Sequence, residues 1–208
     1  MTILKNTFGI IITLFLLISC KQSNDQSNDQ LFEKAYSLGE ENQYEKAVEI
    51  YSKLIQQNGK LQVVYYNRGF CYLNMKKYSM ALADFNKVME LQTHNGMIIT
   101  YNKDMPYADE EVKSQVPYYD ALYKRAQVKY YMDSIKSSFI DFQVLVDNNY
   151  EEKSNCLTWQ GTIWVRSGKN DKACEYFQRA KSFATNNEDR QDADEYIKKY
   201  CSQEKSPH

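Results

Sequence analysis

The sequence predicts an all-α fold, an α-solenoid of about four helix pairs followed by one capping helix. Three observations lead to this prediction. One template of apolar, small and aromatic residues occurs four times, turn-forming residues are scarce (7 Gly and 3 Pro in 208 residues), and large rings are abundant (18 Tyr and 9 Phe). Few turn formers and many amphipathic rings suit packed helices better than a sandwich of short strands.

The repeated template places a small residue four positions after an apolar one, a second small residue twelve positions later, and then an aromatic and a final apolar residue. Its four copies are Leu31, Ala35, Ala47, Tyr51 and Leu54; Tyr65, Gly69, Ala81, Phe85 and Val88; Leu122, Ala126, Ser138, Phe142 and Leu145; and Leu157, Gly161, Ala173, Phe177 and Ala180. Small residues let two antiparallel helices approach closely, and the aromatic one turn later fills the space toward the next pair. Each copy therefore predicts one helix pair.

This pattern resembles the tetratricopeptide repeat, which has a small residue in its first helix and an A-x-x-x-F motif in its second. The resemblance covers residues 30–187 with one interruption, and it implies a scaffold that binds a protein or peptide partner. Lys129 departs from the pattern, because Tyr72 and Trp164 hold the same place in copies two and four. We assign residues 31–94 to repeats one and two and residues 118–187 to repeats three and four.

An insertion separates repeats two and three. The spacing between second small residues is 34 from Ala47 to Ala81 but 57 from Ala81 to Ser138, which places extra residues at 95–117. This segment contains the acidic run 109–111 and an apolar stretch at 97–99. Two interpretations stay open, since a long connection can contact a partner or can be a tolerated surface excursion.

The N-terminus has the pattern of an export signal. Lys5 precedes an apolar run at 8–18, which is long enough for a signal peptide and short for a membrane span. Residues 17–20, LISC, resemble a bacterial lipobox, which implies removal of residues 1–19 and lipid attached to Cys20. An uncleaved anchor helix or an ordinary secretory peptide is the alternative.

Residues 20–30 predict a disordered tether, because the stretch KQSNDQSNDQ after the cysteine has no apolar side chain to offset the entropy of ordering. Lys21, in place of an Asp beside the lipidated residue, resembles an outer-membrane address. We therefore expect a lipid-anchored protein of the bacterial cell envelope, on its outer membrane.

The C-terminal part predicts a capping helix at 188–202 and a disordered tail at 203–208. The helix has one apolar stripe, which consists of Ala193, Tyr196, Ile197 and Tyr200. A solenoid end needs such a helix, because its outer face must be polar. The run from KACEYFQRAKSF to YIKKYC also resembles the end of repeat lipoproteins common in Bacteroidota-type bacteria.

Four cysteines remain after Cys20, and an oxidising envelope permits them to pair. Cys174 lies near the start of the last repeat's second helix, and Cys201 lies near the end of an antiparallel cap. This pair could join the cap to the last repeat if its Cα atoms lie within about 7 Å. Cys71 and Cys156 fall in first helices, where burial as free thiols is the alternative.

Enzyme chemistry has no support in the sequence. The two histidines, His94 and His208, have no nucleophile or metal-ligand partner nearby, and CxxC, HExxH, GxSxG and phosphate-binding glycine motifs are absent. The balance of 26 basic and 27 acidic residues disfavours nucleic acid as a partner. We expect no catalysis, cofactor, metal or small-molecule substrate.

Paired charges recur inside two repeats. Arg68 with Asp84, and Arg125 with Asp141, occupy the same two places in repeats two and three. Repeats one and four lack both partners and have Lys34 with Ile50, and Gln160 with Tyr176. This covariation predicts a structural ion pair within each helix pair, with ligand recognition as the alternative.

The first helices place pairs of side chains one turn apart on the side that a solenoid turns inward. These positions hold Phe32 and Tyr36, Tyr66 and Phe70, Tyr123 and Gln127, and Thr158 and Thr162. Only Asn67 and Lys124 match the clamp that tetratricopeptide domains use for acidic peptide tails, so the resemblance does not imply that function. The rings predict an aromatic groove for another protein, although aromatics at helical spacing also form cores.

Two functions follow from these patterns. The first is a non-enzymatic, membrane-anchored scaffold that binds a protein along the groove. The alternative is an accessory or structural lipoprotein of an uptake, secretion or outer-membrane assembly system, which contacts its partner through residues 95–117.

Overall fold

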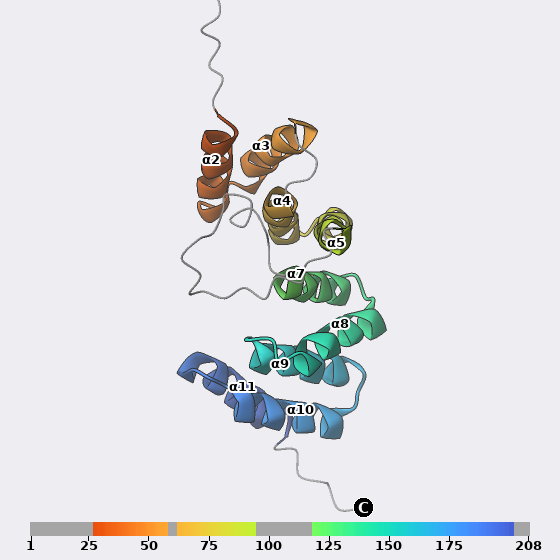
Figure 1. Cartoon of the computed structure of the whole chain (residues 1–208). Coiled ribbons are helices and arrows are strands. Elements are labelled where there is room, and N and C mark those ends of the chain that lie inside the picture. Colours follow the sequence, from red (N-terminus) through yellow and green to blue (C-terminus); the bar gives the residue numbers. More distant parts are fainter. Residues whose placement is uncertain (1–26, 58–61, 95–117, 202–208) are drawn as a thin grey trace, which may run out of the picture.

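The computed structural model describes residues 27–57, 62–94 and 118–201. Its described elements are all α-helices, stacked in order from α2 at one end to α11 at the other (Figure 1). They are α2 (Asn28–Glu40), α3 (Tyr44–Gln57), α4 (Gln62–Asn74), α5 (Tyr78–His94), α7 (Tyr118–Tyr131), α8 (Ile135–Asp147), α9 (Lys153–Arg166), α10 (Asn170–Phe183) and α11 (Asn187–Tyr200). The predicted fold class is confirmed. The predicted signal peptide, Cys20, the insertion and the tail lie outside the described residues.

The first helix begins earlier than the sequence predicted. Residues 28–30 belong to α2, whereas the composition predicts that they are part of the tether. The Ser27 hydroxyl oxygen accepts a hydrogen bond from the Gln30 N–H at 3.3 Å, and Asp29 lies in the first turn. This cap and the favourable placement of a carboxylate near the helix N-terminus extend the helix into a segment that has no apolar residue.

The template residues form the core of each helix pair. All four template aromatics, Tyr51, Phe85, Phe142 and Phe177, are at most 1% exposed, and every small template residue is buried between its two helices. Where Ser138 replaces alanine, its hydroxyl donates to the Ala126 carbonyl at 2.8 Å, so that no polar group is left unsatisfied there.

The turns inside the four repeats share one geometry. Asn42, Lys76, Asp133 and Gly168 each have a positive φ, between 58° and 70°. In each turn the next N–H donates to the carbonyl five residues earlier, as from Lys77 to Tyr72 at 2.8 Å. This arrangement is the Schellman motif, which satisfies the last carbonyls of the first helix and reverses the chain at the same place in every repeat.

The first helices lie on the inner side of the stack. α2 contacts α4, α4 contacts α7 and α9 contacts α11, in addition to the contacts between neighbours in sequence. The second helices α3, α5, α8 and α10 make no comparable contacts with one another in the described part of the chain. First helices of different repeats therefore lie side by side along the stack (Figure 1).

The capping helix α11 packs on α10. Tyr196 and Tyr200 stack on the Phe177 ring, with centroids 4.9 and 6.0 Å away. Cys174 and Cys201 form a disulfide with Cα atoms 5.5 Å apart, as the sequence predicted. Cys71 and Cys156 are buried free thiols. No helix in the described ranges is long and apolar enough to cross a bilayer.

Candidate partner-binding face

The predicted groove residues divide into two rows. In the first row, Phe32, Tyr66 and Tyr123 each pack edge-on against the template aromatic of their own repeat, with centroids 5.8 to 6.0 Å apart. These positions lie three residues before the small residue, so they share its helix face and point toward the second helix. Tyr123 is 7% exposed. It is a core residue, and the prediction that it presents its ring to a partner is wrong.

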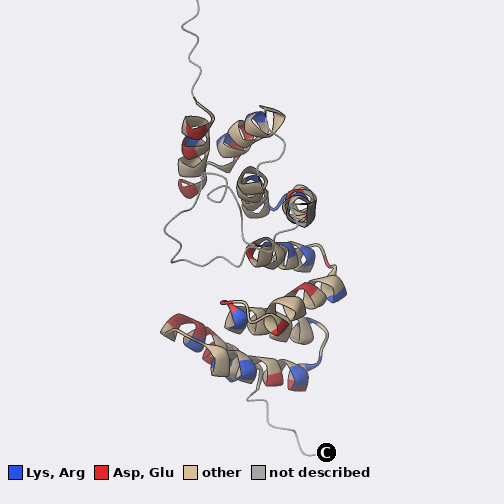
Figure 2. Ribbon diagram, viewed as in Figure 1, with Lys and Arg blue, Asp and Glu red and all other residues tan. Residues whose placement is uncertain are grey.

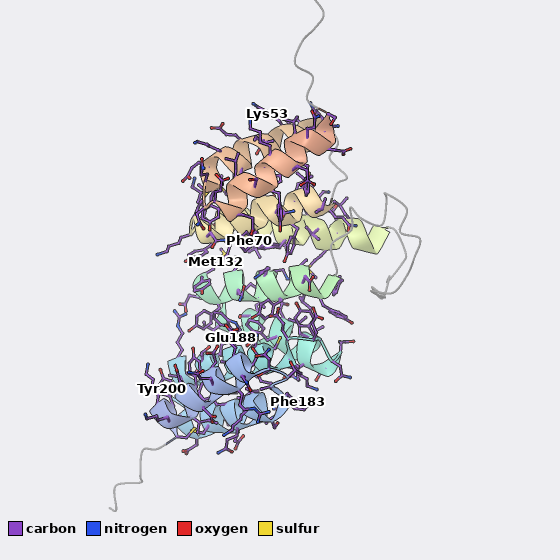
Figure 3. The ribbon with its side chains drawn as sticks, turned by 90° about the vertical axis from the view of Figure 1, so that its left-hand side faces the viewer. Lys53, Phe70, Met132, Phe183, Glu188 and Tyr200 are labelled. Atoms are coloured by element: carbon purple, nitrogen blue, oxygen red, sulfur yellow. A yellow bond between two sulfur atoms is a disulfide. The ribbon has the colours of Figure 1, made fainter. Side chains whose placement is uncertain are left out.

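The second row lies one residue after the small residue and is more open. Tyr36 is 47% exposed, while Phe70, Gln127 and Thr162 are partly exposed. Together with the partly exposed Lys124, Thr158 and Asn67, this row forms what we call the first-helix face. Its Phe70 is labelled in Figure 3. Phe32 and Tyr66 are half-buried at its base.

Two first helices meet on this face through a cation–π contact. The Lys124 Nζ of α7 lies 5.7 Å from the centroid of the Phe70 ring of α4 and 5.5 Å from that of Tyr123. Burial lowers the pKa of Lys124, while Glu152 and Asp120 oppose this shift. The Asn67 amide instead donates to the Val63 carbonyl of its own helix at 2.9 Å. The two clamp-like residues are thus already engaged within the protein.

Both predicted ion pairs form, and both are bidentate. Arg68 donates through Nε and Nη2 to the two carboxylate oxygens of Asp84 at 2.8 and 2.7 Å. Arg125 makes the same two bonds to Asp141, both at 2.8 Å. Lys129 adds a contact to Asp141 at 2.7 Å, which accounts for its departure from the aromatic consensus. The carboxylates are buried, and this geometry agrees with a structural role.

Both arginines also form a hydrogen bond with the preceding repeat. The remaining Arg68 nitrogen, Nη1, donates to Ser52 on α3 at 3.1 Å, and that of Arg125 donates to Asn86 on α5 at 3.3 Å. In repeat four Gln160 takes the arginine's place and donates to Gln143 on α8 at 2.9 Å. The residue before the first small template residue therefore links successive helix pairs in repeats two, three and four, whether its side chain is charged or neutral.

A hollow of about 210 Å³ lies between α9 and α11. Its lining residues are Asn155, Thr158, Trp159, Thr162, Asp192 and Tyr196. The sequence predicted only the two threonines as groove positions. The apolar stripe of α11 predicts only a cap on the last repeat, whereas α11 also contacts α9 as one first helix contacts the next.

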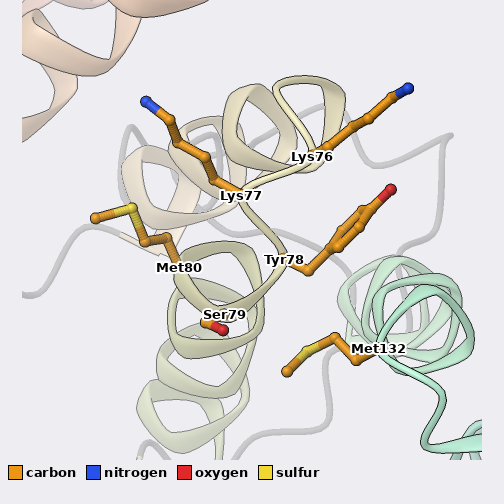
Figure 4. Close-up of a pocket in the computed structure, with 6 residues that line it drawn as sticks. All are labelled: Lys76, Lys77, Tyr78, Ser79, Met80 and Met132. Atoms are coloured by element: carbon orange, nitrogen blue, oxygen red, sulfur yellow. The ribbon is translucent and has the colours of Figure 1, made fainter.

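A second hollow, of about 460 Å³, lies at the edge formed by the turns. It is lined by residues 76–80 and by Met132. The amino groups of Lys76 and Lys77 point away from Met132 (Figure 4). Met80 is 52% exposed, and the hollow is shallow and wide open to solvent. It offers little enclosed surface to a ligand.

Comparison with known proteins identifies the first two repeats. Residues 31–60 and 63–95 each match a family model described as tetratricopeptide repeat. The fold is a tetratricopeptide-repeat α-solenoid. The chain is 32% identical over 72 residues to dynein axonemal assembly factor 4 of Rattus norvegicus, a match that covers 35% of this chain and 17% of that protein.

Two solved tetratricopeptide structures show the same fold. MamA 41-end from Desulfovibrio magneticus RS-1 has a TM-score of 0.60 at 18% identity, over 76% of this chain and 75% of that one. YrrB, described as a TPR protein with an unusual peptide-binding site, has a TM-score of 0.54 at 19% identity, over 86% and 90%.

Repeats three and four lie outside the matched ranges yet have tetratricopeptide geometry. Repeat three has the same ion pair as repeat two, and all four repeats share the positive-φ turn. Tetratricopeptide repeats are protein-interaction scaffolds.

Within the residues that the structure describes, no group of three or more His, Cys, Asp or Glu side chains could hold a metal ion.

Proposed function

We propose that the protein is a non-enzymatic scaffold, anchored by lipid on Cys20 in the bacterial cell envelope, that binds a partner segment along the first-helix face. One observation chiefly supports the binding surface. The template aromatics are buried in the core, whereas every residue of the second row keeps accessible surface: Tyr36 is 47% exposed, and Phe70, Gln127 and Thr162 are partly exposed. Rings and polar groups in such a row suit a helix or an extended peptide.

A pull-down of the full chain from detergent-solubilised membranes tests the binding surface. Replacing Tyr36 and Phe70 by Ala should weaken capture of the partner by at least about 2 kcal/mol if they are hot spots. Replacing Ile140 by Ala is the matched control, because it is 51% exposed on the second helix α8. Equal capture by both variants would contradict the proposal. Loss of the partner on deletion of residues 95–117 alone would favour the insertion as the contact.

The lipid anchor has its own test. A thioether-linked lipid needs the sulfur of Cys20, so Cys20→Ser should release the protein into a soluble fraction or leave an unprocessed precursor. Fractionation and metabolic lipid labelling measure the outcome. Unchanged processing and labelling of the variant would refute lipid attachment at this residue.

A further inference from the structure

The hollow between α9 and α11 has the size of a site for one side chain. Its volume of about 210 Å³ is below the roughly 300–1,000 Å³ of small-molecule pockets. It continues the first-helix face, because Thr158 and Thr162, which line it, are the repeat-four members of the two rows. A peptide that follows this face would therefore pass over the hollow.

Two aromatic walls of the hollow are held in place. The Trp159 ring stacks on Phe142 at 5.8 Å between centroids, and its indole N–H donates to the Tyr123 hydroxyl at 3.2 Å. The Tyr196 ring stacks on Phe177 at 4.9 Å, and the disulfide ties the far end of α11 to α10. Rings fixed in this way can bind a group at little cost in side-chain entropy.

The polar groups of the hollow favour a hydrogen-bond donor with positive charge. The hydroxyls of Thr158 and Thr162 donate to carbonyls of their own helix, at 3.2 and 2.7 Å, so their oxygens are left as acceptors toward the hollow. Asp192 adds a carboxylate, whereas no Lys or Arg lines the hollow. Two rings and a carboxylate around one space attract a cation through ring quadrupoles and charge.

Acidic residues lie at the beginnings of three inner helices (Figure 2). Asp120 is in the first turn of α7, Glu152 precedes α9, whose first residue is Lys153, and Glu188 and Asp189 are in the first turn of α11. Glu152 and Asp189 both lie close enough to raise the pKa of the Tyr123 hydroxyl, which burial already raises. Acids in first turns stabilise their own helices, but Asp192 lies beyond the first turn of α11.

Lys199, which lies near the Tyr196 hydroxyl, has its Nζ 5.1 Å from the centroid of the Tyr200 ring. Two other cations also have contacts within the protein. Lys181 pairs with Asp194 at 2.7 Å, and Arg190 donates to the Ala184 carbonyl at 3.5 Å. We propose that the hollow binds a Lys or Arg side chain of the partner segment, held between the Trp159 and Tyr196 rings against Asp192. This inference rests on the proposed binding function and specifies the chemistry of the partner.

An array of random twelve-residue peptides, probed with the full chain in detergent, tests the inference. Wild-type protein should enrich peptides with Lys or Arg, and replacing that residue by neutral citrulline or norleucine should weaken binding about threefold to tenfold. Asp192→Asn should cause a loss of the same size. Asp192→Lys should shift the preference at that peptide position to Asp or Glu.

Asp194→Asn is the matched control, because it removes the same charge from the same helix at a residue that pairs with Lys181. It should bind the enriched peptides like wild type. Circular dichroism should show all three α11 variants folded, since Asp192 is exposed. Enriched peptides without a basic residue, or equal losses in Asp192→Asn and Asp194→Asn, would overturn the inference and leave the scaffold proposal intact. Enrichment of no peptide would overturn both.

Discussion

Removal of the Asp84 carboxylate should destabilise the solenoid strongly. The carboxylate is 5% exposed and accepts both hydrogen bonds of the Arg68 fork, while the Arg68 side chain is 18% exposed. Burial raises the pKa of Asp84 more than Arg68 lowers it, so desolvation offsets much of the attraction within the intact pair. The loss of one partner is costly because the other charge stays in a largely dry site.

The magnitude follows from the degree of burial. Breaking a fully buried pair costs about 3–5 kcal/mol. Arg68 keeps some solvent and its bond to Ser52, so we expect about 3 kcal/mol for Asp84→Ala, or roughly 6–12 °C in Tm. Asp141→Ala should cost at least about 1 kcal/mol more, because it leaves Arg125 and Lys129 together without their carboxylate.

Urea denaturation of Arg68→Ala, Asp84→Ala and the variant with both replacements measures the coupling energy between the two side chains. Repeat four shows which uncharged pair fits these two positions. It has Gln160 and Tyr176 there, and Gly161 at the position of Gly69. The matched double replacement in repeat two is therefore Arg68→Gln with Asp84→Tyr. This double variant should be more stable than Asp84→Ala by at least about 1 kcal/mol. If the costs of Arg68→Ala and Asp84→Ala add within about 0.5 kcal/mol in their double variant, the ion pair does not stabilise the fold as we argue.

Three further predictions concern the backbone and the cap. Replacing Cys174 and Cys201 by Ala should lower the free energy of unfolding by about 3 kcal/mol. Urea denaturation of wild type and variant, each with and without reductant, measures the loss. If reductant still destabilises the variant, the disulfide is not the cause of the effect. Lys76→Gly should raise stability by about 0.5–1 kcal/mol in a thermal melt, because glycine adopts a positive φ without steric cost; a lower Tm would contradict this. Gly161→Ala should lower the free energy of unfolding by about 1–3 kcal/mol, because the new Cβ would collide with the Phe177 ring. Gly39→Ala is the control and should be tolerated, because its Cβ would make only an ordinary contact with Cys71. Equal effects of the two replacements would refute the packing argument.

Much of the fold could be predicted because its determinants are local. The template sets which residues of each helix pair touch, and its constant offsets bring Arg68 to Asp84 and Arg125 to Asp141. The disulfide between Cys174 and Cys201 could be predicted because α10 and α11 are neighbours that run antiparallel. Such contacts depend on helical geometry alone.

The candidate site was less predictable because it depends on contacts between repeats. Helical spacing placed Tyr36 and Tyr123 on the same side of their helices, yet one is open and the other buried beneath Tyr150 and Trp159. The role that we propose for Asp192 depends on the packing of α11 beside α9, which the sequence did not reveal. The start of α2 also depended on a single cap at Ser27, which composition does not reveal.

Photo-crosslinking in the cells that make the protein tests the central claim most directly. A photoreactive amino acid in place of Tyr36 or Thr162 would lie on the first-helix face, at opposite ends of the solenoid, while one in place of Ile140 would lie on the outer helix α8. The account predicts that the two inner positions crosslink the same protein and that the outer position does not. Adducts from Ile140 alone, or different proteins at the two inner positions, would contradict it.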